Sequence, residues 1–136
     1  MYRAWTDGAY SPRRNCGGWA FIIVPPLPLR CVEMRCHVCN TTSQRMELEA
    51  LRVALTSVPE GAEIEVITDS EYAVHGFNRD WLLQANLDLW ERIWELGDAR
   101  VVTMTFSPRC SIPEQIEVDH LAKLAVEEGG LTNHPE

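Results

Sequence analysis

Three short runs of mostly apolar residues occupy the first third of the chain, at residues 2–6, 17–24 and 31–39. Each has the length and the β-branched and aromatic content of a β-strand. A proline-rich turn at 25–28 separates the second run from the third. The pattern predicts three strands joined as an antiparallel meander.

From Thr42 to Val58 the apolar period changes to that of a helix. Thr42 can cap the start of this helix, and Pro59 ends it. A strand at 64–68 follows. Because a helix that joins two strands of one sheet is normally a right-handed crossover between parallel neighbours, we expect strand 64–68 to run parallel to strand 2–6.

The second half of the chain adds three helices and one strand. A short helix capped by Asp69 and Ser70 ends near Phe77, another begins at Asn86 or Leu87, and a strand spans 101–106. The second of these helices carries an apolar stripe that we assign to core packing rather than nucleobase stacking: Leu89, Trp90, Ile93 and Trp94. The last helix is expected from Pro113 to about Glu128, with these residues able to face the sheet: Ile116, Leu121, Leu124 and Ala125. The class is mixed α/β.

The 136 residues, 46% of them hydrophobic, suit one domain at 1–128 followed by a tail at 129–136. No apolar stretch approaches the roughly 20 residues of a membrane span, and the first residues do not resemble a signal peptide, so a cytoplasmic protein is expected. Twelve basic against 20 acidic residues give a net charge of −8. That balance argues against a nonspecific nucleic-acid coat.

The five cysteines are an odd number, so a disulfide framework is not expected. They are Cys16, Cys31, Cys36, Cys39 and Cys110. Cys31, Cys36 and Cys39, with His37 between the last two, resemble part of a zinc site but lack a second separated ligand pair. We interpret this segment as strand residues, with Cys36 on one face and His37 and Cys39 on the other, and keep metal binding as an alternative.

Four carboxylates stand where surface charge is not expected: Asp7, Glu47, Asp69 and Asp119. If the strands ending near Asp7 and Asp69 are parallel neighbours, both side chains leave the same sheet edge, where open α/β sheets bind ligands. Four clustered carboxylates would repel one another unless divalent cations offset them, and hard oxygen ligands favour Mg²⁺ or Mn²⁺. The alternative is that the four serve separately as turn, cap and solvated helix residues.

At these residues the chain resembles the type 1 ribonuclease H family. The resemblance rests on an ordered set of motifs that spans most of the chain: Thr6-Asp7-Gly8, Gly17-Gly18-Trp19-Ala20, Thr41-Thr42-Ser43-Gln44-Arg45-Met46-Glu47-Leu48, Thr68-Asp69-Ser70-Glu71-Tyr72, Asn86-Leu87-Asp88-Leu89-Trp90 and Asp119-His120-Leu121-Ala122. It implies a five-stranded mixed sheet with helices on both faces. It also implies endonucleolytic cleavage of the RNA strand of RNA/DNA hybrids, which leaves 5′-phosphate and 3′-hydroxyl ends.

The resemblance also implies residue roles. Asp7 would bridge two Mg²⁺ ions, with Glu47 and Asp69 on the leaving-group side and Asp119 on the side of the attacking water. The family positions that contact the hybrid are matched by Gly8, Thr42, Ser43 and Gln44. Discrimination between RNA and DNA would rest on the 2′-hydroxyls.

The chain departs from the family pattern at four places, one of which is Ser43-Gln44 in place of two asparagines. Arg13 and Arg14 stand in the loop after the first aspartate, where they could bind phosphates or simply be solvated. Arg109 replaces the loop histidine of many relatives, and because arginine stays protonated it could steady phosphate or product but not act as a base. The segment 77–86 carries only Arg79 as a cation where bacterial relatives insert a basic helix. We therefore expect weak, salt-sensitive binding of hybrid or help from a partner.

Two alternatives remain at this stage. Integrases, junction resolvases and some exonucleases share the fold and the acidic cluster but lack the Arg45-Met46-Glu47 helix pattern. A catalytically weak or silent hybrid-binding domain that needs a partner is the other alternative, motivated by the acidic surface and the missing basic helix. The protein itself is expected to be a monomer.

Overall fold

The computed structural model describes residues 1–109 and 111–132, with side chains described as far as residue 128. Cys110 and residues 133–136 of the expected tail lie outside the described residues. In chain order the elements are β1 (Tyr2–Ser11), β2 (Cys16–Val24), β3 (Val32–Cys39), α1 (Ser43–Thr56), β4 (Glu63–Thr68), α2 (Glu71–Phe77), α3 (Leu87–Asp98), β5 (Val101–Phe106) and α4 (Pro113–Thr132).

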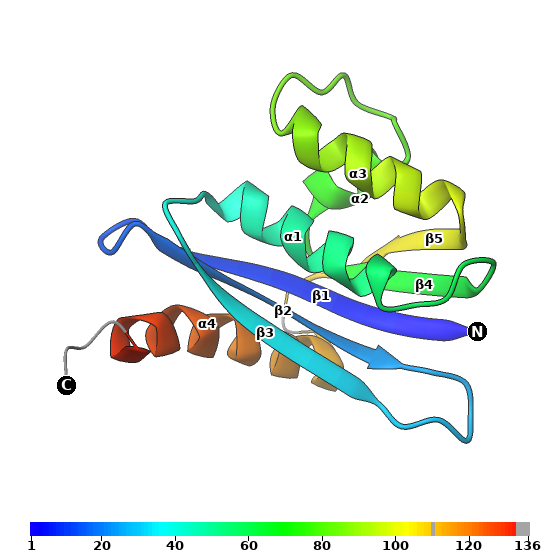
Figure 1. Cartoon of the computed structure of the whole chain (residues 1–136), viewed down its shortest axis with the longest axis horizontal. Helices are drawn as coiled ribbons and strands as arrows, with labels where there is room; N and C mark the ends of the chain where they lie inside the picture. The colour runs from blue at the N-terminus through cyan, green and yellow to red at the C-terminus, as the bar shows by residue number, and fades with distance from the viewer. Residues whose placement is uncertain (110, 133–136) are drawn as a thin grey trace.

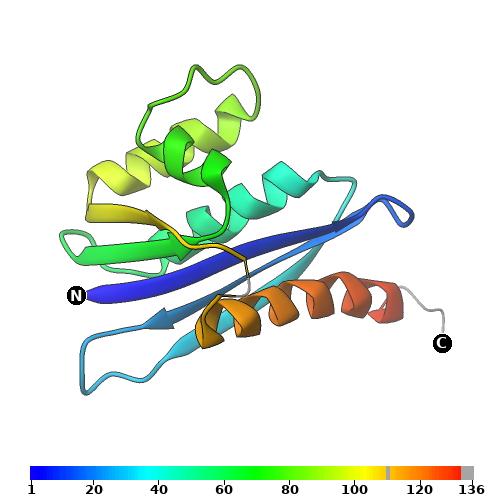
Figure 2. The same cartoon turned by 180° about the vertical axis from the view of Figure 1, so that it is seen from behind.

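The strands form one five-stranded mixed sheet in the order β3-β2-β1-β4-β5 (Figure 1). The β1, β2 and β3 strands are antiparallel neighbours, whereas β4 pairs in parallel with both β1 and β5. The predicted meander and the predicted parallel pairing of the first and fourth strands are therefore confirmed. Helices α1, α2 and α3 cover one face of the sheet and α4 covers the other (Figures 1 and 2).

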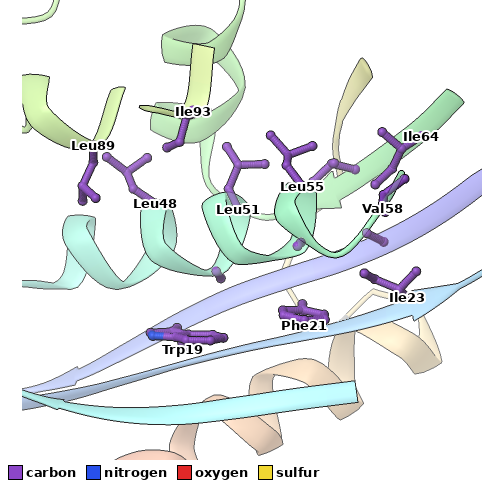
Figure 3. Close-up of a cluster of buried hydrophobic side chains, with 14 of the residues drawn as sticks. Trp19, Phe21, Ile23, Leu48, Leu51, Leu55, Val58, Ile64, Leu89 and Ile93 are labelled. Carbon is purple, nitrogen blue, oxygen red and sulfur yellow. The ribbon is translucent and has the colours of Figure 1, made fainter. Parts of the chain in front are cut away.

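The larger core cluster surrounds α1 and fills the space between this helix, the sheet and α3 (Figure 3). Strand β2 contributes Trp19, Phe21 and Ile23, α1 contributes Leu48, Leu51, Leu55 and the following Val58, β4 contributes Ile64, and α3 contributes Leu89 and Ile93. Trp90 is fully buried and its indole nitrogen donates to the Tyr72 hydroxyl at 3.0 Å. The aromatic stripe of α3 is thus core, as the helical spacing indicated.

Strand β1 is longer than the pattern predicted. The sequence suggested an end at Thr6, but β1 continues to Ser11 because it pairs with β2 as far as Ser11 opposite Cys16. Its parallel pairing with β4 ends at Trp5 opposite Ile67. Asp7 therefore lies within a strand, just beyond the last residue that β4 pairs.

The buried face of α4 also differs from the prediction. Ile116 is 51% exposed, whereas Gln115 is 2% exposed and Val118 is fully buried. Gln115 replaces the expected apolar residue because its amide donates to the Ser107 carbonyl at 3.1 Å, which satisfies a buried polar group. Helix α4 extends to Thr132, beyond the predicted end near Glu128. In the described part of the chain, every helix is too short or too polar to span a bilayer.

Candidate active site

Three carboxylates from separate elements meet at the edge of the sheet where β1 and β4 diverge. Asp7 lies on β1, Glu47 in the first turns of α1, and Asp69 directly after β4. An oxygen of each lies within 4.8 Å of an oxygen of the other two. Asp7 is only 3% exposed, so the centre of the group is shielded from water.

Gly8 allows α1 to approach β1 at this point. A Cβ at Gly8 would lie 2.5 Å from the Glu47 backbone nitrogen and 2.6 Å from the Met46 carbonyl carbon, so no larger residue fits without moving the helix. The Gly8 N–H donates to Asp7 Oδ1 at 2.9 Å and to Glu47 Oε1 at 3.0 Å. One backbone donor therefore orients two of the three carboxylates.

The start of α1 is held from two sides. The Thr42 hydroxyl caps the helix by accepting from the Arg45 backbone N–H at 3.2 Å. The Arg45 guanidinium binds both carboxylate oxygens of Asp88, at 3.2 and 2.9 Å, and contacts Asn86 at 3.1 Å. These partly exposed contacts contribute little stability, but they set where the turn containing Glu47 lies relative to α3.

Asp119, on α4, stands beside this group with two cations of its own. Arg109 Nη2 donates to Asp119 Oδ1 at 3.2 Å, and Lys123 Nζ lies 3.0 Å from Asp119 Oδ2. Sequence reasoning did not place Lys123 in the site. The available signal was its spacing of one helical turn after Asp119, which puts both side chains on one face.

Burial and mutual repulsion disfavour the charged forms of the clustered carboxylates. Burial first, and then the charge of Asp69, raise the pKa of Asp7 to about 7. Burial and the neighbouring Asp7 raise the pKa of Glu47 well above its usual value. The pKa of Asp69 is also raised, chiefly by burial, with Arg109 opposing the shift.

Asp119 behaves in the opposite way. Burial disfavours its charge, but the hydrogen bonds with Lys123 and Asp7 and the positive charges of Lys123 and Arg109 outweigh burial and lower its pKa. Asp119 is therefore ionised where Asp7 and Glu47 tend to hold protons. The group therefore combines the ionised Asp119 with Asp7, Glu47 and Asp69, whose pKa values are raised.

Two adjoining clefts open over this group. A cleft of about 350 Å³ is lined by Asp7, Gly8, Ser43, Gln44, Glu47, Asp69, Ser70 and Arg109. A larger cleft of about 520 Å³ shares Gly8, Ser43 and Arg109 with it, and its other charged lining residues are Arg13, Arg14, Lys123 and Glu127. Cationic side chains thus line the surface next to the acidic centre.

The predicted contact residues are divided between these clefts. Gln44 lines the smaller cleft, which holds the carboxylates, and Arg13 and Arg14 line the larger, cationic cleft. Gly8 and Ser43 line both clefts. Thr42 is not among the lining residues of either cleft, and its observed role is to cap α1.

Solved structures place the fold in a known class. The chain superposes on the N-terminal RNase H domain of rv2228c from Mycobacterium tuberculosis, solved as a fusion with maltose-binding protein, with a TM-score of 0.83, 17% identity and 98% of each chain covered. It also superposes on LC11-RNase H1 in complex with RNA/DNA hybrid, with a TM-score of 0.80, 20% identity, and 95% of this chain and 99% of that chain covered. The fold is that of ribonuclease H.

Sequence comparison identifies the family. The RNase H family model matches residues 2–126. A ribonuclease H of Chlorobium phaeovibrioides is 32% identical over 90% of this chain and 92% of its own length, and one of Chlorobium phaeobacteroides is 33% identical over 75% and 77%. The chain belongs to the ribonuclease H family.

The raised pKa of Asp7 predicts a pH-dependent stability of the protein in EDTA. The folded-state pKa of about 7 exceeds the ordinary value of 3.8, so the folded protein binds the extra proton between these values. The protonation of Asp7 contributes fully to the stability of the fold below about pH 4, and this contribution is lost as the pH rises to about 7. Asp7→Asn carries no charge, and we expect it to raise the free energy of unfolding at pH 8 by up to about 4 kcal/mol.

Urea unfolding at pH 5 and pH 8 measures the difference in the free energy of unfolding between Asp7→Asn and the wild type. This difference should be smaller at pH 5 than at pH 8. Asp98→Asn, at an exposed position on α3, is the matched control and should have no such effect. An Asp7→Asn variant that is less stable than the wild type at pH 8 would contradict the repulsion described above.

Proposed function

We propose that this protein is a divalent-metal-dependent endonuclease that hydrolyses the RNA strand of RNA/DNA hybrids and leaves 5′-phosphate and 3′-hydroxyl ends. The observation that carries the proposal is the convergence of Asp7, Glu47 and Asp69 within 4.8 Å, in a chain of the ribonuclease H family. Asp7 is buried, Glu47 and Asp69 are half-buried, and all three have raised pKa values, so the group is poorly placed for a purely structural role, because burial and neighbouring carboxylates disfavour the ionised forms.

The donor set fits a hard divalent cation. All the converging groups are carboxylates, and Glu47 Oε2 is a buried oxygen without a hydrogen-bond partner among the described residues. Such an oxygen is available as a ligand, and oxygen donors suit Mg²⁺, with Mn²⁺ as a substitute. We assign Asp7, Glu47 and Asp69 to one ion, and Asp7 and Asp119 to a second.

When bound, two such ions supply Lewis-acid activation of the attacking water and stabilisation of the leaving 3′-oxygen. The protein's own part is to hold the carboxylates in place. Gly8 orients Asp7 and Glu47 through one N–H, and Lys123 keeps Asp119 ionised. This arrangement exists before substrate arrives, so little reorganisation is needed.

Arg109 is placed to neutralise phosphate charge. It is exposed, it belongs to the lining of both clefts, and its contact with Asp119 is one that a cation at Asp119 would displace. The guanidinium would then be free to bind a phosphate oxygen. Because it stays protonated, Arg109 steadies the negative charge and takes no part in proton transfer.

The hybrid would lie across both clefts. The backbone at Gly8 and Ser43 and the amide of Gln44 border the carboxylates, where hydrogen bonds to 2′-hydroxyls can select RNA. Arg13, Arg14 and Lys123 line the neighbouring cleft and can bind backbone phosphates, which offsets the net charge of −8 locally.

Cleavage of an end-labelled hybrid in Mg²⁺, Mn²⁺ or EDTA tests the function, with single-stranded RNA, double-stranded RNA and DNA as controls. We expect internal cuts in the hybrid's RNA strand, dependent on metal and absent in Asp7→Asn, while Asp98→Asn remains fully active. An active Asp7→Asn variant would disprove the site. A folded wild type that binds hybrid but never cleaves it would instead support the silent hybrid-binding domain.

Removal of the Arg109 charge should slow cleavage without preventing binding. We expect Arg109→Ala to lower kcat by about 10-fold to 100-fold, with a smaller change in KM, because its contact with phosphate strengthens as negative charge develops. Arg109→Lys should restore part of the loss, and Arg92→Ala, an exposed arginine on α3, should be neutral. Steady-state kinetics measure the effect, and an unchanged kcat in Arg109→Ala would exclude the role.

The two loop arginines predict a change in salt dependence. In the inactive Asp7→Asn background, replacing both Arg13 and Arg14 with alanine should weaken hybrid binding and reduce the slope of log K against log salt by about 1 to 2. Fluorescence anisotropy at several salt concentrations measures the slope. An unchanged slope would show that both arginines are merely solvated, and Arg92→Ala again serves as the control.

A further inference from the structure

A second group of potential metal ligands lies at one end of the β2–β3 pair. Cys16 is the first residue of β2 and Cys39 the last of β3, and the two are directly opposite each other in the antiparallel register. His37 lies two residues before Cys39 on the same strand. One ligand atom from each residue lies within 4.8 Å of the other two.

The strand alternation explains why these three side chains share a face. His37 is opposite Gly18, where a Cβ would lie 2.6 Å from the Ala122 carbonyl oxygen, so this face of the sheet is the one covered by α4. Cys36 points to the other face, opposite Trp19. The group therefore differs from the segment that the sequence suggested, because Cys16 joins His37 and Cys39 in place of Cys31 and Cys36.

The distance between two of the ligand atoms matches a tetrahedral zinc site. Cys39 Sγ and His37 Nε2 lie 3.4 Å apart. Two such ligands on one tetrahedral zinc ion, with Zn–S of about 2.3 Å and Zn–N of about 2.0 Å, would be about 3.5 Å apart. The other ring nitrogen, His37 Nδ1, is buried and has no hydrogen-bond partner among the described residues, so the imidazole's polar contact is with the sulfur.

The group is also accessible to a metal ion. Cys39 is exposed and Cys16 half-buried, which leaves a side open through which an ion can enter and a water molecule can complete the coordination. Thiol and imidazole ligands select zinc over magnesium. The group is thus chemically distinct from the all-oxygen cluster around Asp7.

We propose that Cys16, His37 and Cys39 form a zinc site with three protein ligands and water in the fourth position. Binding replaces two S–H bonds with two Zn–S bonds and releases both thiol protons to the solvent, with no change of oxidation state. The ion would join the end of β3 to the start of β2, directly after the loop that carries Arg13 and Arg14. It would therefore fix the position of the loop that borders the cationic cleft.

The arrangement next to the site supports this role. Asn15 and Asn40, which follow the loop and β3 respectively, are already joined by an Nδ2–Oδ1 hydrogen bond of 2.9 Å and a backbone hydrogen bond of 2.9 Å. The Cys16 thiol donates to the Arg14 carbonyl at 3.2 Å, and metal binding would remove this proton. A zinc ion would thus replace the thiol contact of Cys16 and add to the hydrogen bonds that already join Asn15 and Asn40.

Cobalt titration of the reduced, metal-free protein tests the proposal, because a thiolate ligand produces a sulfur-to-cobalt charge-transfer band that carboxylate ligands cannot produce. We expect this band to saturate at a single equivalent, with the visible spectrum of tetrahedral cobalt, and to disappear when zinc is added. Cys16→Ser and Cys39→Ser should each abolish the band, and His37→Ala should weaken it. Cys36→Ser, on the opposite face of β3, is the matched control and should retain it.

Circular dichroism of each metal-free variant establishes that it is folded before titration. In the wild type and in Cys36→Ser, zinc should raise the melting temperature by more than it does in Cys16→Ser, because a ligand that binds only the folded state stabilises it. Absence of the charge-transfer band in folded, reduced wild type would overturn the proposal. So would an equal band in Cys16→Ser.

Discussion

The close approach of α1 to β1 at Gly8 is the contact on which the site depends. The missing side chain lets the backbone of Met46 and Glu47 lie where a Cβ would otherwise be, and the Gly8 N–H binds Asp7 and Glu47 together. The apolar cluster around α1 holds the helix in place, with Trp19 and Phe21 of β2 on one side of it and Leu48, Leu51 and Leu55 directed toward α3 and β4 on the other (Figure 3). Core packing therefore brings together two carboxylates whose charges repel each other, and the stability of the core opposes that repulsion.

The net charge of the chain does not describe the charge around the site. The chain carries a net charge of −8, yet Arg13, Arg14, Arg109 and Lys123 line one continuous surface beside the carboxylates. Arg109 and Lys123 compensate Asp119, whereas Asp7 and Glu47 respond to burial with raised pKa values. An acidic centre bordered by cations is suited to binding a phosphodiester together with divalent metal, which is the activity proposed above.

Most of the secondary structure could be predicted because periodicity and turn residues are local signals. The crossover of α1, the caps at Thr42 and Ser70 and the burial of Trp90 all follow from short segments. The predictions were wrong where contact with an element distant in the sequence determines the length of a strand or the buried face of a helix. Strand β1 continues to Ser11 because β2 pairs with it, and Gln115 is buried in place of Ile116 because the Ser107 carbonyl needs a donor. The residues of β1 do not by themselves indicate the pairing with β2, and the residues of α4 do not by themselves indicate the contact with Ser107.

The sequence by itself determined the class of fold, the family resemblance and the choice of Asp7, Glu47, Asp69 and Asp119 as candidate ligands, because strand ends, helix spacing and motif order are properties of the linear chain. Only the tertiary structure decided which groups are neighbours. It placed Arg109 on Asp119, and it put Cys16 opposite Cys39 beside His37. The physical reason is that strand register and helix packing bring residues from distant segments within a few ångströms, and single-sequence patterns do not encode those distances.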